Sequence, residues 1–191
     1  KFLNPGSRTL TLSEHDVTVG EDRRLESGTF ETGDFSVTVK GDVYNDATHS
    51  SSAPNSVDPS DLRGIVMAGN GRQKLERGLV GTSYFGTLTI DNANSVIIED
   101  ETFYTFQVDQ ALVLRQGVLD ISSNLFVIGE NATIQNSLGN SGRDDFNLNN
   151  MVQTNSTFQD FGLRKMFTDN TTIDFVYPIG QQTYTPMVLE M

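Results

Sequence analysis

The chain has no cysteine, only two histidines, and about half as many basic as acidic residues, 13 against 25. The absence of cysteine excludes disulfide bonds and thiolate metal sites. A formal charge of -12 opposes binding to a phosphate backbone or to an anionic membrane surface, so nucleic acid is not an expected partner. No apolar run approaches the roughly 20 residues of a membrane-spanning helix, so membrane insertion is not expected either.

The scarcity of histidine also leaves few ways to assemble a Ser/His/Asp triad. His15 lies in a turn between two short apolar segments, and His49 lies in a polar segment. We expect both histidines to be solvated. Two charged stretches should face solvent as well. They are the turn from Gly20 to Arg24 and the outer side of a later strand, with Arg72, Lys74, Glu76 and Arg77.

What the sequence does contain is a series of short apolar pulses, most regular from Gly86 to Ile134. Each pulse alternates with polar neighbours, which is the period of two of a half-buried strand. Strands this short cannot close a core alone and must stack on copies of themselves. We therefore predict an all-β chain folded as a right-handed parallel β-helix, or β-solenoid, with irregular loops. The residues expected to point into its core are Leu88, Ile90, Val96, Ile98, Leu112, Leu114, Leu119, Ile121, Phe126 and Ile128.

An internal similarity supports a repeat. The segment from Gly28 to Asp42 and the segment from Gly117 to Asn131 both open with glycine, place a bulky apolar residue two positions later and then an acidic one. The two glycines are about 89 residues apart, close to four repeats of about 22 residues. The match needs one inserted residue. It predicts that the two segments occupy equivalent places in the repeat.

Three stretches depart from the pulsed pattern. Residues 45–63 are rich in Ser, Asn, Asp and Pro and should form a polar loop inserted into a solenoid domain of residues 1–134. Long excursions often carry binding surfaces, although a solvated insertion without a role is the alternative. Residues 135–150 should form a second loop. Residues 151–191 should form a β-rich cap or the start of a next domain, such as the first sheet of a β-sandwich.

Carboxylates are the main candidates for chemistry, because β-helix polysaccharide lyases hold Ca²⁺ with acidic residues on successive turns. The candidates are Glu99, Asp100, Glu101, Asp120 and Glu130. The first three are consecutive and would point in different directions, so a charged turn that keeps the solenoid edge soluble explains them better. We assign no catalytic, cofactor-binding or metal-binding residue.

Two further polar patterns have functional and incidental interpretations. Asp144 and Asp145 could hold a cation with Asn147, Asn149 and Asn150, but the spacing matches no EF-hand-type loop. Three triplets match the N-glycosylation acceptor pattern, which also arises by chance in β proteins rich in Asn and Thr. They begin at Asn131, Asn155 and Asn170.

Four segments follow in order along the chain: GTLTI, GVLDISSNLFVIGENATI, MVQTNSTFQDFGLRKMF and FVYPIGQQTYTPMVLEM. Their order resembles the large secreted and surface proteins of Bacteroidota that the type IX secretion system exports. In that family, solenoid turns precede a segment of the form F-P-(I/V)-G-x-x-x-x-Y-x-P-(V/M). The resemblance covers about residues 10–191. The motif is carried here by Tyr177, with Tyr in place of the usual Phe, and by Pro178, Ile179, Gly180, Tyr184, Pro186 and Met187.

The resemblance implies a setting and partners. Family members begin with a signal peptide and end in a sorting domain, whereas Lys1 to Gly6 lacks the apolar core of a signal peptide. We therefore expect an internal portion of a longer polypeptide, located extracellularly or on the outer membrane exterior. The implied partners are the rest of that polypeptide, the type IX secretion machinery, and surface glycans or cell-surface ligands.

Two classes of function follow. The first is a non-enzymatic structural or adhesin-like surface module whose stacked turns form a stiff spacer. The second is a carbohydrate-active β-helix enzyme, a polysaccharide lyase or hydrolase. Such an enzyme should carry a groove lined by carboxylates with basic or aromatic partners in successive turns, and the sequence shows no such column.

Overall fold

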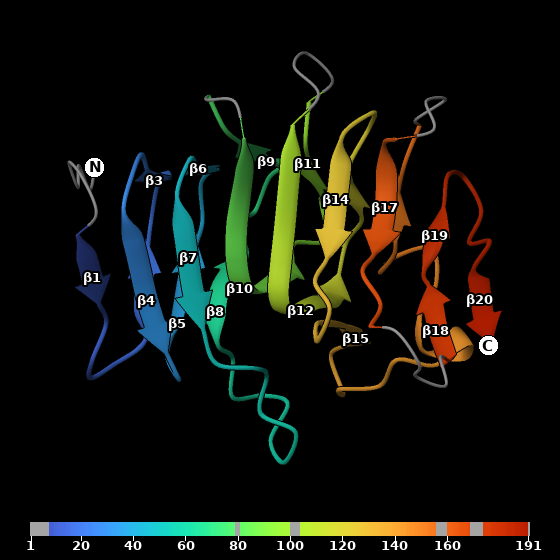
Figure 1. Cartoon of the computed structure of the whole chain (residues 1–191), viewed down its shortest axis with the longest axis horizontal. Coiled ribbons are helices and arrows are strands. Elements are labelled where there is room, and N and C mark those ends of the chain that lie inside the picture. The colour runs from blue at the N-terminus through green and yellow to red at the C-terminus, as the bar shows by residue number, and fades with distance from the viewer. Residues whose placement is uncertain (1–7, 79–80, 100–103, 156–159, 169–173, 191) are drawn as a thin grey trace.

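The computed structural model of the chain describes residues 8–78, 81–99, 104–155, 160–168 and 174–190. The chain is a parallel β-solenoid of about seven turns, and its axis runs from the N-terminal to the C-terminal end (Figure 1). Within the described ranges the helical content is one short 3-10 turn, η1 (Arg143–Asp145). The predicted fold class is confirmed.

Two columns of strands make up one 11-stranded sheet. The first column consists of β1 (Thr9–Thr11), β4 (Thr29–Gly33), β7 (Thr48–Ser51), β10 (Thr82–Asp91), β12 (Thr105–Gln116), β14 (Leu125–Ile128) and β17 (Gly162–Lys165). The second consists of β2 (Val17–Val19), β5 (Ser36–Val39), β8 (Gly64–Met67) and β15 (Thr133–Asn136), with the later halves of β10 and β12. Because β10 and β12 pass through both columns, they join the columns into a single sheet.

A 7-stranded parallel sheet closes the third side of the solenoid. Its strands are β3 (Arg23–Leu25), β6 (Val43–Asn45), β9 (Gln73–Glu76), β11 (Val96–Ile97), β13 (Leu119–Asp120), β16 (Val152–Gln153) and β19 (Ile179–Gly180). At the C-terminal end, β18 (Asp174–Tyr177) and β20 (Met187–Glu190) pair antiparallel. The parallel ladders thus run on to Gly180, well past residue 134, where the sequence placed the last solenoid turn.

The core is a set of columns in which apolar side chains of successive turns stack on one another. Leu88 pairs with Leu112, and Phe106 pairs with Phe126. Like side chains in register pack well against each other and leave few voids, which is the source of solenoid stability. All ten residues predicted to point inward are fully buried, at 0% exposure, so this prediction is confirmed.

The internal similarity between Gly28 and Gly117 does not mark equivalent places in the turn. Gly28 leads into β4 on the large sheet, whereas Gly117 leads into β13 on the 7-stranded sheet. Both glycines sit at corners with a positive φ, of 83° and 85°. Corners on different sides of the solenoid need the same left-handed backbone, and this shared requirement produced the similarity.

Both predicted polar loops are shorter than the sequence suggested. Within residues 45–63, Thr48–Ser51 forms β7, so the excursion begins at Ser52. Within residues 135–150, Phe146 is buried and packs into the core, and the Asn136 side chain accepts hydrogen bonds from the backbone N–H groups of Leu138 and Asn140. Side-chain to backbone bonds thus give this second segment a defined structure.

Two arginines assigned to solvent are buried. Arg23, in the predicted charged turn, begins β3 and lies over the ring of Phe30, 4.9 Å from its centroid. Arg77, assigned to the outer side of a strand, donates hydrogen bonds to the carbonyls of Gly81 and Thr105 in neighbouring segments. Long side chains with several donors reach the carbonyls of neighbouring segments, which local sequence patterns do not reveal.

Buried asparagines connect successive turns at the corners. The side-chain amides of Asn45, Asn92 and Asn124 are fully buried and donate to carbonyls of other turns. Asn92 reaches Gly71 O at 2.7 Å, and Asn45 reaches Tyr84 O at 3.0 Å. Satisfied amides in a buried setting specify register, since an unpaired amide there would be costly.

Candidate functional site

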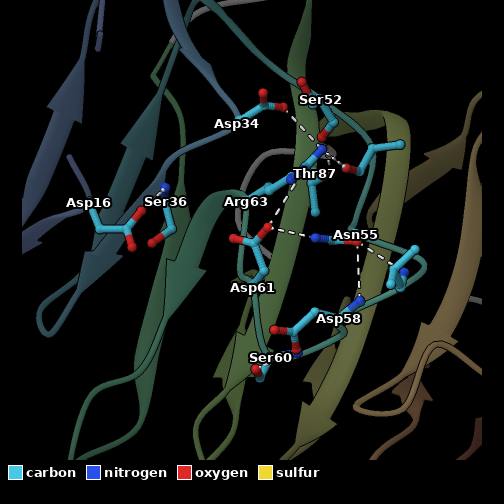
Figure 2. A network of polar contacts seen from close by, with 12 residues as sticks. Asp16, Asp34, Ser36, Ser52, Asn55, Asp58, Ser60, Asp61, Arg63 and Thr87 are labelled. Carbon is cyan, nitrogen blue, oxygen red and sulfur yellow. Dashed lines mark hydrogen bonds and ion pairs between the residues drawn. The ribbon is translucent and has the colours of Figure 1, made fainter. Parts of the chain in front are cut away.

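The segment from Ser52 to Arg63, hereafter the 52–63 loop, is the main excursion from the solenoid wall (Figure 1). It folds back over the outer face of the second strand column (Figure 2). Outward-facing side chains there, Val66, Thr89 and Val113, are buried at 1%, 1% and 5% exposure. The loop is therefore an ordered part of the wall.

Arg63 holds the base of the 52–63 loop. Its Nη1 lies 3.0 Å from Asp34 Oδ1 and donates to the carbonyl of Ala53 at 3.1 Å. Also at the base, the hydroxyl of Thr87 donates to Ser52 O at 3.0 Å. Nearer the tip, Arg115 donates to Pro59 O at 3.3 Å. Residues of three different turns thus fix the loop, Asp34 and Thr87 at its base and Arg115 nearer its tip. Figure 2 shows the two contacts at the base.

The tip of the loop is built from nested side-chain to backbone hydrogen bonds. Asn55 Oδ1 accepts from the backbone N–H groups of Val57 and Asp58, at 2.9 and 3.1 Å (Figure 2). The Ser60 hydroxyl and, to a smaller extent, the Ser60 backbone N–H donate hydrogen bonds to the Asp58 carboxylate. These hydrogen bonds lower the pKa of Asp58 below its ordinary value. This arrangement presents Val57 to solvent at 91% exposure. A preformed loop that exposes one apolar side chain among polar groups is suited to recognition, because little ordering entropy is lost on binding.

The 7-stranded sheet carries a second polar surface, a row of ion pairs on its outer face that we name the charged row. Arg24 pairs with Glu26 at 2.7 Å, Lys74 with Glu99 at 2.8 Å and Arg72 with Asp120 at 3.2 Å. Sequence reasoning missed this row. Lys74 and Glu99 come from different turns, as do Arg72 and Asp120, and only stacking brings them to one face.

An aromatic ring extends the charged row at its N-terminal end. The guanidinium of Arg24 lies over the ring of Tyr44, 3.8 Å from its centroid, and the Tyr44 hydroxyl hydrogen-bonds to Asp46. Burial and this hydrogen bond raise the pKa of Tyr44 to about 12. Arginine over an aromatic face is a favourable cation–π contact.

The acidic candidates do not converge on one point. Asp120 accepts a hydrogen bond from the backbone N–H of Ser122 and one from the Gln153 side chain, and Asp145 accepts one from the N–H of Gly142. Glu130 is exposed in the turn after β14. Asp100 and Glu101 lie outside the described residues. In the described part of the chain, no three His, Asp or Glu side chains are grouped to hold a metal ion.

The two histidines differ from one another. His15 is exposed in a bend, as predicted. His49 is buried at 1% exposure in the first column of the core, 6.0 Å from the rings of both Phe30 and Phe85, so its predicted solvent position is wrong. Its neighbours in β7, Thr48, Ser50 and Ser51, are polar and only partly buried. The sequence of this strand therefore lacks an apolar pattern, and sequence analysis assigned it to a loop.

The glycosylation triplets are described only in part. Asn131 and Thr133 are both exposed at the corner between β14 and β15. Asn155 is exposed, while the rest of its triplet and the whole triplet at Asn170 lie outside the described residues. The corner at Asn131 borders a cavity that residues of β17 and β18 also line.

No described helix has the length and apolar character needed to cross a membrane. No family model, curated protein or solved structure matches this chain.

Proposed function

We propose that this chain is a non-enzymatic, structural and adhesin-like module of a larger exported surface protein, of the kind carried by the type IX secretion system of Bacteroidota. The observation that carries the proposal is the way the acidic side chains are used. Glu99 and Asp120 belong to ion pairs between turns, and Asp145 closes a local turn. These carboxylates have partners within the solenoid wall, and they do not converge on one point.

The continuous core supports the spacer part of the proposal. Parallel strands in neighbouring turns are about 4.8 Å apart, so seven turns make a rod of roughly 30 Å in this section alone. The in-register apolar columns and the buried corner amides resist bending of the rod. Bending would shift neighbouring turns relative to each other, and this shift would separate the stacked side chains and break the hydrogen bonds of the amides. A rod of this kind holds the 52–63 loop at a defined distance and orientation.

The first turn supports the idea that the rod continues in a longer polypeptide. An apolar cavity of about 190 Å³ opens between Leu12 and Val19 of this turn and Phe30 of the next. Leu10 and Val17, in the same turn, are each 38% exposed. Solenoids cover such ends with a capping element or a further turn, since an exposed core promotes aggregation.

The alternative function is a carbohydrate-active enzyme, and the charged row favours it. The row puts Glu99 and Asp120 beside Lys74 and Arg72 on successive turns of one face. These are the residue types that a polysaccharide lyase or hydrolase uses. Against this, the basic partners are exposed, with the Arg72 side chain at 56% and the Lys74 side chain at 42%, and ion pairs with an exposed partner are common features of protein surfaces.

One pair of assays separates the two functions. A panel of acidic and neutral polysaccharides is incubated with the chain, and new reducing ends and unsaturated products are measured. Binding to an immobilised glycan array is measured in parallel. We expect binding without turnover. A turnover rate above about 1 s⁻¹, within the usual enzyme range, would refute the module and favour the enzyme.

A further inference from the structure

A cavity of about 300 Å³ is lined by residues from the corner between β14 and β15, from β17 and the segment after it, and from β18. Figure 1 labels these strands in the C-terminal half of the solenoid. The apolar lining of the cavity comes from Ala132, Ile134 and Val176, which are all buried. Its volume lies at the lower end of the range of small-ligand sites, about 300–1,000 Å³. The cavity can hold a ligand of the size of one or two rings.

Two aromatic rings form one wall of this cavity. Phe167 and Phe175 meet edge to face, with centroids 6.0 Å apart and an interplanar angle of 88°. Lys165 Nζ donates to the carbonyls of Gly129 and Glu130, at 2.6 and 2.7 Å, and lies 5.7 and 5.8 Å from the two ring centroids. The wall therefore combines apolar rings with one fixed positive charge.

The rim of the cavity is polar and exposed. It consists of two carboxylates, Glu130 and Asp174, with the amide of Asn131 and the hydroxyl of Ser141. Carboxylates and amides accept hydrogen bonds from hydroxyl groups, and amides also donate them. A polar rim around an apolar floor is the usual plan of a small-molecule site.

We propose that this cavity binds one neutral sugar residue of a glycan. A sugar ring has an apolar face of C–H groups, which packs on aromatic and aliphatic side chains, and a rim of hydroxyls, which hydrogen-bond to carboxylates and amides. Phe167 and Phe175 offer the first surface, and Asp174 and Asn131 offer the second. The inference rests on the adhesin-like function proposed above and names the ligand class for it.

The charges of the cavity select a neutral ligand. Glu130 and Asp174 outnumber Lys165, and the whole chain carries -12, so an acidic sugar is disfavoured. A cationic ligand would bind over the aromatic faces, but the ammonium group of Lys165 already lies close to both rings.

A second cavity, of about 460 Å³, is lined by uncharged residues 179–183 with Thr154 and Thr185 and lacks an aromatic wall.

The test is a titration of the ¹⁵N-labelled full chain with methyl glycosides of neutral hexoses and N-acetylhexosamines, with a methyl hexuronide as the charged comparison. We expect saturable shifts confined to residues 129–134, 141, 165–167 and 174–176 for at least one neutral glycoside. Binding should be weaker by at least about tenfold in Phe167→Ala, which corresponds to about 1.4 kcal/mol, because the variant lacks one of the two rings on which the sugar packs. It should be weaker by severalfold in Asp174→Asn, an exposed change that leaves the packing intact.

Asp58→Asn, at the tip of the 52–63 loop, is the matched control and should bind like the unchanged chain. The inference is overturned by an absence of saturable shifts with every neutral glycoside, by shifts elsewhere, by binding that Asp174→Asn leaves unchanged, or by tighter binding of the hexuronide. These outcomes leave the non-enzymatic function standing. Turnover of a polysaccharide would instead remove that function without deciding what the cavity binds.

Discussion

The backbone N–H of Gly86 donates a hydrogen bond to Nδ1 of His49 over 3.3 Å, inside the core of the solenoid. Nδ1 is therefore unprotonated, and Nε2, 3.1 Å from the Thr32 hydroxyl, carries the single ring proton. Both ring nitrogens are engaged by different turns. The fold thus requires the neutral imidazole at a position flanked by Phe30 and Phe85.

This requirement predicts a loss of stability in mild acid. Burial of the imidazole lowers the pKa of His49 well below its ordinary value of 6.5, and the positive charge of Arg23 is a second, smaller cause. The unfolded chain then binds a proton near pH 6.5 that the folded chain does not. The stability contributed by neutral His49 is present above pH 6.5 and is lost as the pH falls below it, by up to about 2 kcal/mol at pH 5.

Chemical denaturation at pH values from 5 to 8 measures this loss. In His49→Phe the free energy of unfolding should change much less between pH 6.5 and 5, because the titrating group is gone. His15→Gln is the control and should keep the slope, since His15 is exposed. An unchanged slope in His49→Phe would show that another group causes the acid sensitivity.

A charge in the apolar columns should be strongly destabilising. Ile98 and Leu114 are fully buried, so Ile98→Asp and Leu114→Asp each bury an unpaired group and should cost about 4 kcal/mol or more. The control is Val57→Asp at the exposed loop tip, which should change stability by about 0.5 kcal/mol or less. Thermal unfolding compares the three, and equal shifts in melting temperature would contradict the assignment of core and loop.

Ser51 is unsuitable as a loop control, although the sequence placed it in the polar excursion. Its hydroxyl accepts a hydrogen bond from the N–H of Thr87 at 2.7 Å and donates to the carbonyl of Ser52. A change there affects the junction between β7 and the neighbouring turn. Val57, with no such contact to a strand, tests the loop alone.

Gly117→Ala should destabilise the chain by about 3 kcal/mol. Gly117 has a φ of 85°, and an added Cβ would collide with the carbonyl of Asn92 in the neighbouring turn. Gly20→Ala is the matched control, because a Cβ at Gly20 meets no atom within 4 Å. Urea denaturation of both variants measures the difference. Equal stabilities would mean that the corner tolerates a side chain.

Arg63→Ala should release the 52–63 loop without unfolding the solenoid. The change removes the ion pair with Asp34 and the hydrogen bond to Ala53 at the base of the loop. Hydrogen exchange of the loop amides, such as Val57 N–H and Asp58 N–H, should become faster, while amides in β10 and β12 keep their protection. Arg72→Ala removes an exposed arginine from an ion pair on another face of the solenoid and should leave loop exchange unchanged. Unchanged loop exchange in Arg63→Ala would show that Thr87 and Arg115 suffice to hold the loop.

The period-two pulses were enough to determine the architecture. Leu88 and Ile90 alternate with the polar residues Thr87, Thr89 and Asp91, and a strand too short to bury its own face has few ways to fold except by stacking. The all-β class, the parallel pairing and the ten core positions were therefore predictable from local pattern. The length of a turn, about 18 to 25 residues where no loop intervenes, also matched the expected period of about 22.

Tertiary structure decided which polar residues lie inside and which surfaces exist. His49 and Arg23 look like solvated turn residues in sequence, and they are buried because the neighbouring turns supply hydrogen bonds, rings and backbone contacts. The charged row depends on pairs such as Arg72 and Asp120, and the aromatic wall of the cavity near the C-terminal end depends on Phe167 meeting Phe175. Periodicity in sequence specifies which face of a strand is apolar. The partners of a polar side chain come from other turns, which are brought together only when the turns stack. The free energy of the contacts with these partners decides whether the polar side chain is buried.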